Sequence, residues 1–179
     1  KYIIGAILSF AVLGTSFAQD DENLVENPSF ESTKGKLKRL KQVNKAVDWL
    51  SPTKLRADLF STSAGGTEIG VPMNIYGKED AADGENYAGI IAFTYRGKDP
   101  RTYVFSQLKE KLEKGVRYCV SYKVSLADLS KYAINNLGAH LSKKPFEVEG
   151  KHDIVLGKKE TVVKVADNKI FEKRYSWDK

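Results

Sequence analysis

The chain has 179 residues, about the length of one domain, and its 41% apolar residues suffice for a hydrophobic core. Charged residues make up 29%, which excludes a membrane bundle. The net charge of +6 would suit an acidic partner, but Asp and Glu are interspersed with Lys, which favours a mixed solvated surface. Cys119 is the only cysteine, which excludes an internal disulfide, and with only His140 and His152 beside it no Cys- or His-built zinc site is expected.

Residues 1–18 have the features of a secretory signal peptide. Lys1 gives a positive start, an apolar stretch runs from Tyr2 to Leu13, and small or polar residues lead to Ala18. The alternative is a membrane anchor, but the apolar stretch is shorter than the roughly 20 residues that a span needs, and acidic residues follow it. We therefore expect export, cleavage after residue 18, and a domain over residues 19–179.

The N-terminal half of the mature chain is expected to hold short strands, turns and one basic segment. Residues 23–31 (NLVENPSFE) predict a short strand that runs into an Asn-Pro turn. Residues 34–48 are basic and place apolar side chains at near-helical spacing. Small and polar residues predict loops at 61–70 and 77–84, and an apolar run predicts a strand over 87–93.

Strand signals are strongest in the C-terminal half. Apolar and polar side chains alternate over residues 116–126, which predicts a strand whose even-numbered residues face the core. Residues 137–141 repeat the pattern, and residues 154–156 and 161–165 bracket a Gly-Lys-Lys turn that predicts a hairpin. Many short strands with few helices predict an all-β fold, an antiparallel β-sandwich or barrel.

Several segments carry a resemblance to known families. The NLVENPSFE opening, followed later by Trp49, resembles the first strand of galactose-binding-like, carbohydrate-binding jelly rolls. Residues 48–61, 70–90 and 117–142, taken with this opening, are similar to the N-terminal region of OmpA-family outer-membrane proteins of the Bacteroidetes. The resemblance covers most of the mature chain through the order and spacing of these segments, each of which is weak alone.

The resemblance implies a β-sandwich of jelly-roll type, followed in that family by a peptidoglycan-binding domain. The chain stops at Lys179, before the last strands that the resemblance leads us to expect, so peptidoglycan anchoring is not expected of these residues. Residues 106–114 have helical propensity, but the resemblance implies an extended segment, and tertiary context often overrides propensity. The resemblance to jelly rolls also implies a structural calcium site to which Asn27 and Glu31 contribute. The alternative is that Asn27 only forms the Asn-Pro turn.

Catalytic patterns are not found in the sequence. No Gly-x-Ser-x-Gly or phosphate-binding loop is present, and Cys119, His140 and His152 read as ordinary residues rather than as a nucleophile or bases. The acids of EDAADGE (Asp80, Asp83, Glu85) have calcium-like spacing but not the EF-hand pattern, which favours a solvated loop. No acid pair is marked by the sequence as that of a glycosidase, and the chain is not expected to be an enzyme.

Aromatic residues in or beside loops are the candidate ligand-binding groups, because their rings offer flat apolar faces to sugars and anchors to protein partners. They are Trp49, Tyr76, Tyr95 and Tyr103, although a core position is the alternative for each. The cationic run between Lys34 and Lys45 has no aromatic residues among its charges, so nucleic acid is not an expected partner, whereas an anionic glycan or lipid surface stays open beside plain solvation.

The sequence therefore predicts a non-catalytic binding or scaffold module of the cell envelope, in the periplasm or at the outer membrane. Its partner would be a glycan or another envelope protein, and any membrane association would be indirect. Two alternatives stay open: a secreted hydrolase with an unrecognised acid pair, and a structural spacer. A pocket with two perturbed carboxylates would favour the hydrolase, and the absence of an exposed aromatic patch would favour the spacer.

Overall fold

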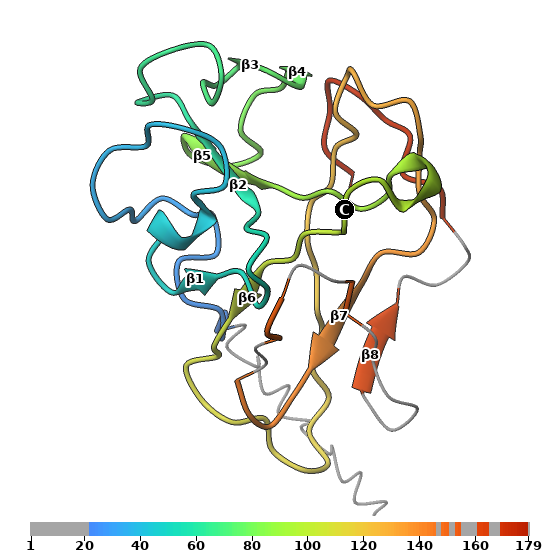
Figure 1. Ribbon diagram of the computed structural model, residues 1–179. Coiled ribbons are helices and arrows are strands. Elements are labelled where there is room, and N and C mark those ends of the chain that lie inside the picture. Colours follow the sequence, from blue (N-terminus) through green and yellow to red (C-terminus); the bar gives the residue numbers. More distant parts are fainter. Residues whose placement is uncertain (1–21, 146–147, 151–152, 155–160, 165–168, 179) are drawn as a thin grey trace, which may run out of the picture.

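The computed structural model describes residues 22–145, 148–150, 153–154, 161–164 and 169–178. Within these residues the regular structure consists of short antiparallel strand pairs and two single-turn 3-10 helices, with no α-helix, as Figure 1 shows. This confirms the expected all-β class. The pairs are β1 (Trp49–Leu50) with β6 (Phe105–Ser106), β2 (Asp58–Ser61) with β5 (Asn86–Gly89), β3 (Met73–Asn74) with β4 (Gly77–Lys78), and β7 (Gly138–Leu141) with β8 (Thr161–Lys164); the helices are η1 (Val43–Lys45) and η2 (Tyr95–Gly97).

The hydrophobic core surrounds strand β2. All four residues of β2 are buried, and Leu59 and Phe60 are almost completely so. The Phe60 ring covers Gly89 of β5, where an added Cβ would lie 2.6 Å from the ring, so only glycine allows this approach. The other members of the core cluster are Leu37, Ala46 and Ile69, with Phe30, Leu40, Trp49, Ala64, Val71 and Tyr87 packed against it.

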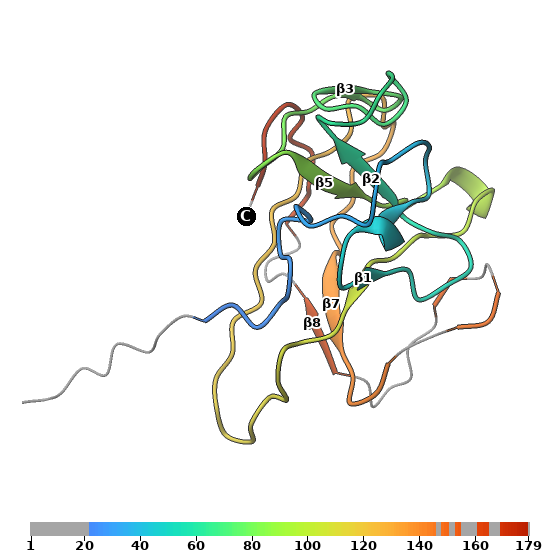
Figure 2. The same cartoon turned by 90° about the vertical axis from the view of Figure 1, so that its left-hand side faces the viewer.

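The β7–β8 pair is one of four two-stranded sheets in the described residues. In both Figure 1 and Figure 2 it lies below the β2–β5 pair. Pairing of Ala139 with Val163 and of His140 with Val162 sets its register. The strand predicted at residues 137–141 is thus confirmed, and its partner is β8. Residues 155–160, on which the predicted hairpin turn falls, lie outside the described part of the chain.

The strand predicted over residues 116–126 is wrong. This segment has no regular strand, and only Val124 forms a bridge, with Asp178. Three of the side chains expected in the core, Val116, Tyr118 and Val120, are 42%, 38% and 39% exposed. Alternation describes a chain that is amphipathic when extended, but burial also needs a neighbouring strand and a facing core. Neither is found here among the described residues.

Helical spacing in residues 34–48 produces only the three residues of η1. Lys41 and Asp48 have positive φ values of 64° and 66°, a conformation that ends an α-helix. The Lys41 N–H donates to Asp58 Oδ1 at 2.6 Å, which ties the segment to β2 instead of to its own preceding turn. The apolar side chains of this segment still reach the core, because Leu37 and Val43 are buried.

Residues 106–114 form no helix, as the resemblance implies. Ser106 ends β6, and Leu108 forms an antiparallel bridge with Val25 of the N-terminal segment. The strand expected over 87–93 is shorter: it is β5, which begins one residue earlier and ends at Gly89. The expected loop spans residues 62–69, since Ser61 ends β2 and Gly70 forms a bridge with it. No helix in the described residues is both long enough and apolar enough to span a bilayer.

Candidate binding surface

Three aromatic side chains on two distant segments form an exposed cluster. Phe93, Tyr95 and Tyr132 are 46%, 53% and 43% exposed. The rings of Tyr95 and Tyr132 are nearly parallel, with 5° between their planes and 6.4 Å between their centroids. Phe93 meets Tyr132 edge to face at 5.0 Å. We call Phe93, Tyr95 and Tyr132 the aromatic cluster.

A tight turn at η2 presents Tyr95 to solvent. The backbone N–H of Lys98 donates to the Tyr95 carbonyl at 3.4 Å, and both central residues of this turn are left-handed, with φ of 56° at Arg96 and 62° at Gly97. Thr94 Oγ1 donates to the Asp99 carbonyl at 2.7 Å and closes the base of the turn. The turn therefore fixes the backbone on both sides of the ring.

Tyr132 is held by a second turn. Its backbone N–H donates to Ser130 Oγ at 3.5 Å, and the same hydroxyl donates to the Tyr132 carbonyl at 2.9 Å. Arg174 Nη2 donates to the Ser130 carbonyl at 2.8 Å, which joins this turn to the C-terminal segment. The Leu129 N–H donates to the Tyr76 carbonyl at 3.2 Å and anchors the turn next to the β3–β4 connection.

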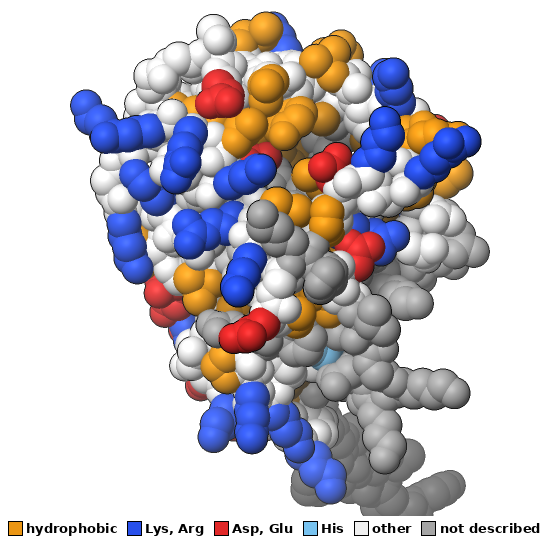
Figure 3. Space-filling view, in the orientation of Figure 1, with side chains coloured by type: hydrophobic (Ala, Val, Ile, Leu, Met, Phe, Trp, Pro, Cys, Tyr) orange, Lys and Arg blue, Asp and Glu red, His pale blue; other side chains and the backbone are white. Residues whose placement is uncertain are grey.

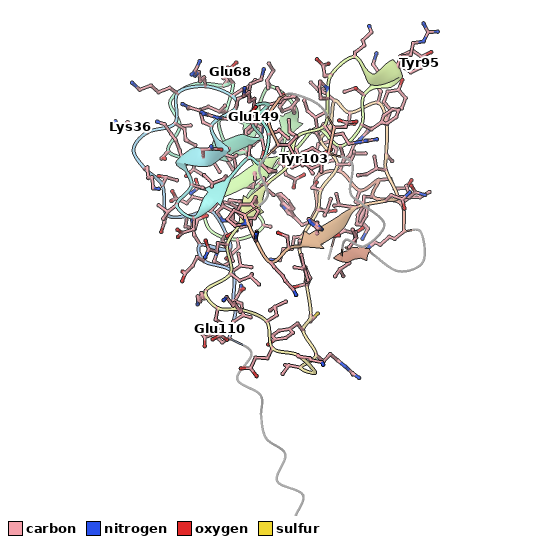
Figure 4. The ribbon with its side chains drawn as sticks, turned by 60° about the horizontal axis from the view of Figure 1, so that its bottom comes forward. Lys36, Glu68, Tyr95, Tyr103, Glu110 and Glu149 are labelled. Atoms are coloured by element: carbon pink, nitrogen blue, oxygen red, sulfur yellow. The ribbon has the colours of Figure 1, made fainter. Side chains whose placement is uncertain are left out.

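A cation lies on the aromatic cluster. The Arg96 guanidinium carbon is 5.1 Å from the centroid of the Tyr95 ring, within the range of a cation–π interaction. Figure 3 shows hydrophobic and cationic side chains side by side on the edge of the molecule where η2 lies in Figure 1. In Figure 4, Tyr95 points outward from that edge, far from Lys36 at the opposite side. The surface thus combines flat apolar faces with positive charge.

The other predicted aromatic residues do not join Tyr95. Trp49 is half-buried against the core; its Nε1 donates to the Asn27 carbonyl at 2.8 Å, and its ring lies 4.5 Å from that of Phe30. Tyr103 lies well inside the outline of the molecule in Figure 4, and its hydroxyl accepts the Ile154 N–H at 3.1 Å. Both therefore have the structural role that the sequence left open as the alternative.

Tyr76 has an intermediate position. It is 37% exposed, and its ring meets the buried Phe60 edge to face at 6.0 Å. Burial raises the pKa of Tyr76, and the charge of the hydrogen-bonded Asp58 carboxylate raises it further. Burial likewise raises the pKa of Asp58, against the lowering effects of the Lys41 N–H and the Tyr76 hydroxyl. The Tyr76 hydroxyl is therefore hydrogen-bonded to Asp58 of β2, inside the β2–β5 region.

Asn27 and Glu31 form internal hydrogen bonds. Asn27 Oδ1 accepts the Ser32 N–H at 2.9 Å, and its Nδ2 donates to the carbonyls of Ser32 and Val47. The Phe30 N–H donates to the Asn27 carbonyl at 3.0 Å, which confirms the expected turn. Glu31 instead accepts backbone N–H groups of Glu85 and Asn86. In the described residues, no group of three or more His, Cys, Asp or Glu side chains has metal-binding geometry.

A second group of polar residues lies beside Tyr87. Burial raises the pKa of Glu79, and the charges of Asp128 and Asp80 raise it further, although Ser125 Oγ donates to Glu79 Oε2 at 2.5 Å. Asp128 Oδ2 accepts the Lys78 N–H at 2.6 Å. These hydrogen bonds hold the β3–β4 pair against the C-terminal half, which is a structural use of both carboxylates.

The remaining sequence candidates lie apart from the aromatic cluster. Cys119 is exposed in the irregular 116–126 segment, and His140 lies in β7 opposite Val162. Asp83 accepts a hydrogen bond from Ser29 Oγ at 2.6 Å, and His152 falls outside the described residues. Cys119 and His140 thus lie in different segments of the described chain.

Sequence reasoning found Tyr95 but missed Phe93 and Tyr132. Two local signals were available: Tyr132 stands between polar residues in SKYA, and Tyr95 and Phe93 flank the Arg-Gly turn of FTYRGKD. An aromatic residue in such a setting has little chance of local burial. Comparisons with family models, with curated proteins and with solved structures gave no match to the chain.

Proposed function

We propose that the chain is a non-catalytic binding module of the cell envelope and that it holds a glycan on the aromatic cluster. One observation carries the proposal: the exposed rings of Phe93 and Tyr95, from one segment, lie 5.0 Å and 6.4 Å from the exposed ring of Tyr132, from another. Exposed apolar surface gathered at one place is typical of an interaction site, whereas single exposed rings need no explanation.

The geometry suits a sugar. Tyr95 and Tyr132 are exposed, nearly parallel rings; the C–H faces of pyranose rings can pack on exposed aromatic surface of this kind, and the tyrosine hydroxyls can bond to sugar hydroxyls. Both turns are fixed by hydrogen bonds, so little order has to be gained when a ligand binds. An envelope protein is the other class of partner, since Tyr and Arg also form protein-binding hot spots.

The setting of this module is part of the same proposal. The signal-like residues 1–18 support export to the periplasm or outer membrane, and the resemblance to OmpA-family proteins supports an envelope role. The all-β content supports a jelly-roll β-sandwich as the complete fold, of which the described strand pairs would be parts.

Binding to immobilised envelope polysaccharides tests the proposal. We expect the protein to be retained by at least one glycan, and Tyr95→Ala and Tyr132→Ala to weaken retention about tenfold, the value of one stacked ring. Tyr175→Ala is the matched control, because Tyr175 is 68% exposed but outside the cluster. Retention by no glycan, or equal loss in all three variants, would contradict the proposal. Retention only by an envelope protein would favour the other partner class.

A hydrolase is the second candidate, favoured by the raised pKa of Glu79 beside Asp128 and Asp80. A glycosidase needs a protonated acid and a second carboxylate about 5 to 9.5 Å away. Against it, both Glu79 and Asp128 already accept internal hydrogen bonds. Release of reducing sugar by the wild type, abolished in Glu79→Gln, would establish the hydrolase; we expect no release from either protein.

A further inference from the structure

The charges around the aromatic cluster are mostly positive. Arg96 and Lys98 belong to the η2 turn, Lys131 precedes Tyr132, and Arg174 binds the carbonyl of Ser130 in the same turn. All four side chains are exposed. Asp99 is the one acid in the η2 turn, and Asp153 near its base is paired with Arg101 at 2.9 Å. A ligand on the cluster therefore meets an excess of positive charge.

Three of these cations form no ion pair with a carboxylate of the described residues. In the described part of the chain, no carboxylate lies within ion-pair distance of Arg96, Lys98 or Lys131. The Arg96 guanidinium carbon lies over the Tyr95 ring at 5.1 Å from its centroid, so the guanidinium is next to the ring on which a ligand would pack. A guanidinium in that position can form paired hydrogen bonds with a carboxylate, phosphate or sulfate group.

The backbone at Arg96 permits a substitution that removes its charge and keeps the turn. Its φ of 56° lies in the left-handed region, where glycine is favoured and a long side chain is strained. Glycine adopts this φ without steric cost, so we expect the turn to keep its geometry if glycine replaces arginine. Arginine is therefore less favourable than glycine at this position, and Arg96→Gly removes the charge without a cost in backbone strain.

We infer that the ligand of the aromatic cluster is an acidic glycan, one whose sugar rings pack on Tyr95 and Tyr132 while its anionic groups bind Arg96 and the neighbouring lysines. The inference rests on the proposed function and narrows its ligand class.

The cationic run at residues 34–45 is the competing site for anions. This run holds more cations, but it lies away from the aromatic cluster. In addition, Lys45 Nζ already donates a hydrogen bond to the Lys36 carbonyl.

Matched pairs of charged and neutral polymers test this inference: polygalacturonate against its methyl ester, and dextran sulfate against dextran. Binding is measured for the full chain at low and high ionic strength. We expect retention by the charged member of at least one pair, weaker retention by its neutral counterpart, and loss with salt, since screening acts on the ionic part.

Two variants locate the charge effect. Arg96→Gly should weaken binding of the charged polymer about tenfold, as expected for lost charge-assisted hydrogen bonds, while the melting temperature stays level or rises because the strain is relieved. Lys36→Gln removes the same charge on the far side of the molecule and should leave binding unchanged (Figure 4).

Three results would overturn the inference in different ways. Equal retention of charged and neutral polymers would leave glycan binding standing and remove the acidic class. Loss of binding in Lys36→Gln but not in Arg96→Gly would move the anion site to residues 34–45. Retention of neither member of either pair would reject the acidic glycan; if other envelope glycans were then retained through Tyr95, the proposed function itself would survive.

Discussion

The carboxylate of Glu31 occupies the space that a side chain on Gly84 would need. Glu31 Oε1 accepts the Asn86 N–H at 3.0 Å, and both carboxylate oxygens accept the Glu85 N–H at 3.1 Å. An added Cβ on Gly84 would overlap the carboxyl group of Glu31. The pair clamps the N-terminal segment to the start of β5, and so places Phe30 and Trp49 against the core.

This clamp predicts an unequal response of two glycines. Gly84 and Gly35 both have left-handed φ values, 65° and 73°, but only at Gly84 would a Cβ meet other atoms. Gly35→Ala should lower the free energy of unfolding by about 1 kcal/mol through backbone strain alone. Gly84→Ala should cost about 1–2 kcal/mol more, because the hydrogen bonds of Glu31 are displaced. Chemical denaturation measures both, and equal losses would show that the clamp contributes nothing.

Packing around β2 gives a second prediction. Leu59 is fully buried, so Leu59→Ala should lower the free energy of unfolding by about 2–5 kcal/mol. Val120 is 39% exposed, and Val120→Ala should change that free energy by no more than about 0.5 kcal/mol. Thermal and urea unfolding of the two variants decide the matter. A large loss in Val120→Ala would restore residues 116–126 as a buried strand.

Alkaline pH should destabilise the fold through Tyr87. Burial raises the pKa of Tyr87 to about 12 from an ordinary value of 10.0, and the acids Glu79, Asp128 and Asp80 add to the rise against the Asn74 hydrogen bond. Between these two pKa values the unfolded chain releases the proton while the folded chain retains it. The contribution of this group to the free energy of unfolding is therefore fully present below pH 10 and is lost as the pH rises toward 12.

Tyr87→Phe removes this titration, and the loss of stability over that pH range should become shallower. Tyr175→Phe serves as the control, because that ring is exposed. Melting temperatures across the alkaline range supply the measurement. An unchanged slope in Tyr87→Phe would contradict the buried-phenol explanation.

The calcium site at Asn27 and Glu31 is an untested prediction. Its alternative, in which Asn27 only forms the turn, is supported by the hydrogen bonds of both side chains. Because the side-chain oxygens of both residues already accept N–H groups, we expect equal melting temperatures in calcium and in chelator. A cation bound only by the folded state must raise the melting temperature. A calcium-dependent rise that disappears in Glu31→Gln would therefore establish the site.

Local patterns predicted part of the fold. The alternation at residues 137–141 found β7, and the turn signal in NLVENPSFE found the turn at Asn27, because both depend on neighbouring residues. The stronger alternation at 116–126 failed, because its burial depends on a distant partner strand that the described chain does not supply. Helical spacing at 34–48 failed for a similar reason: Asp58, in β2, binds the backbone at Lys41.

The candidate binding surface was only partly predictable. Tyr95 was identified because it stands in a loop, but its two partners come together only through tertiary structure. Trp49 and Tyr103 matched the same pattern and are half-buried, since Asn27 and Ile154 supply polar partners for their side chains. The sequence shows which aromatic residues stand in loops, whereas neighbours distant in the sequence determine whether each ring is exposed.

Mapping a bound acidic oligosaccharide by NMR tests the central claim most directly. With side-chain aromatic and arginine signals assigned, oligogalacturonate is titrated into the protein and the shift changes are followed. We predict that the largest changes fall on the rings of Phe93, Tyr95 and Tyr132 and on the Arg96 guanidinium. Changes centred on Trp49 or on residues 34–45, or none at saturating oligosaccharide, would contradict the claim that the aromatic cluster binds an acidic glycan.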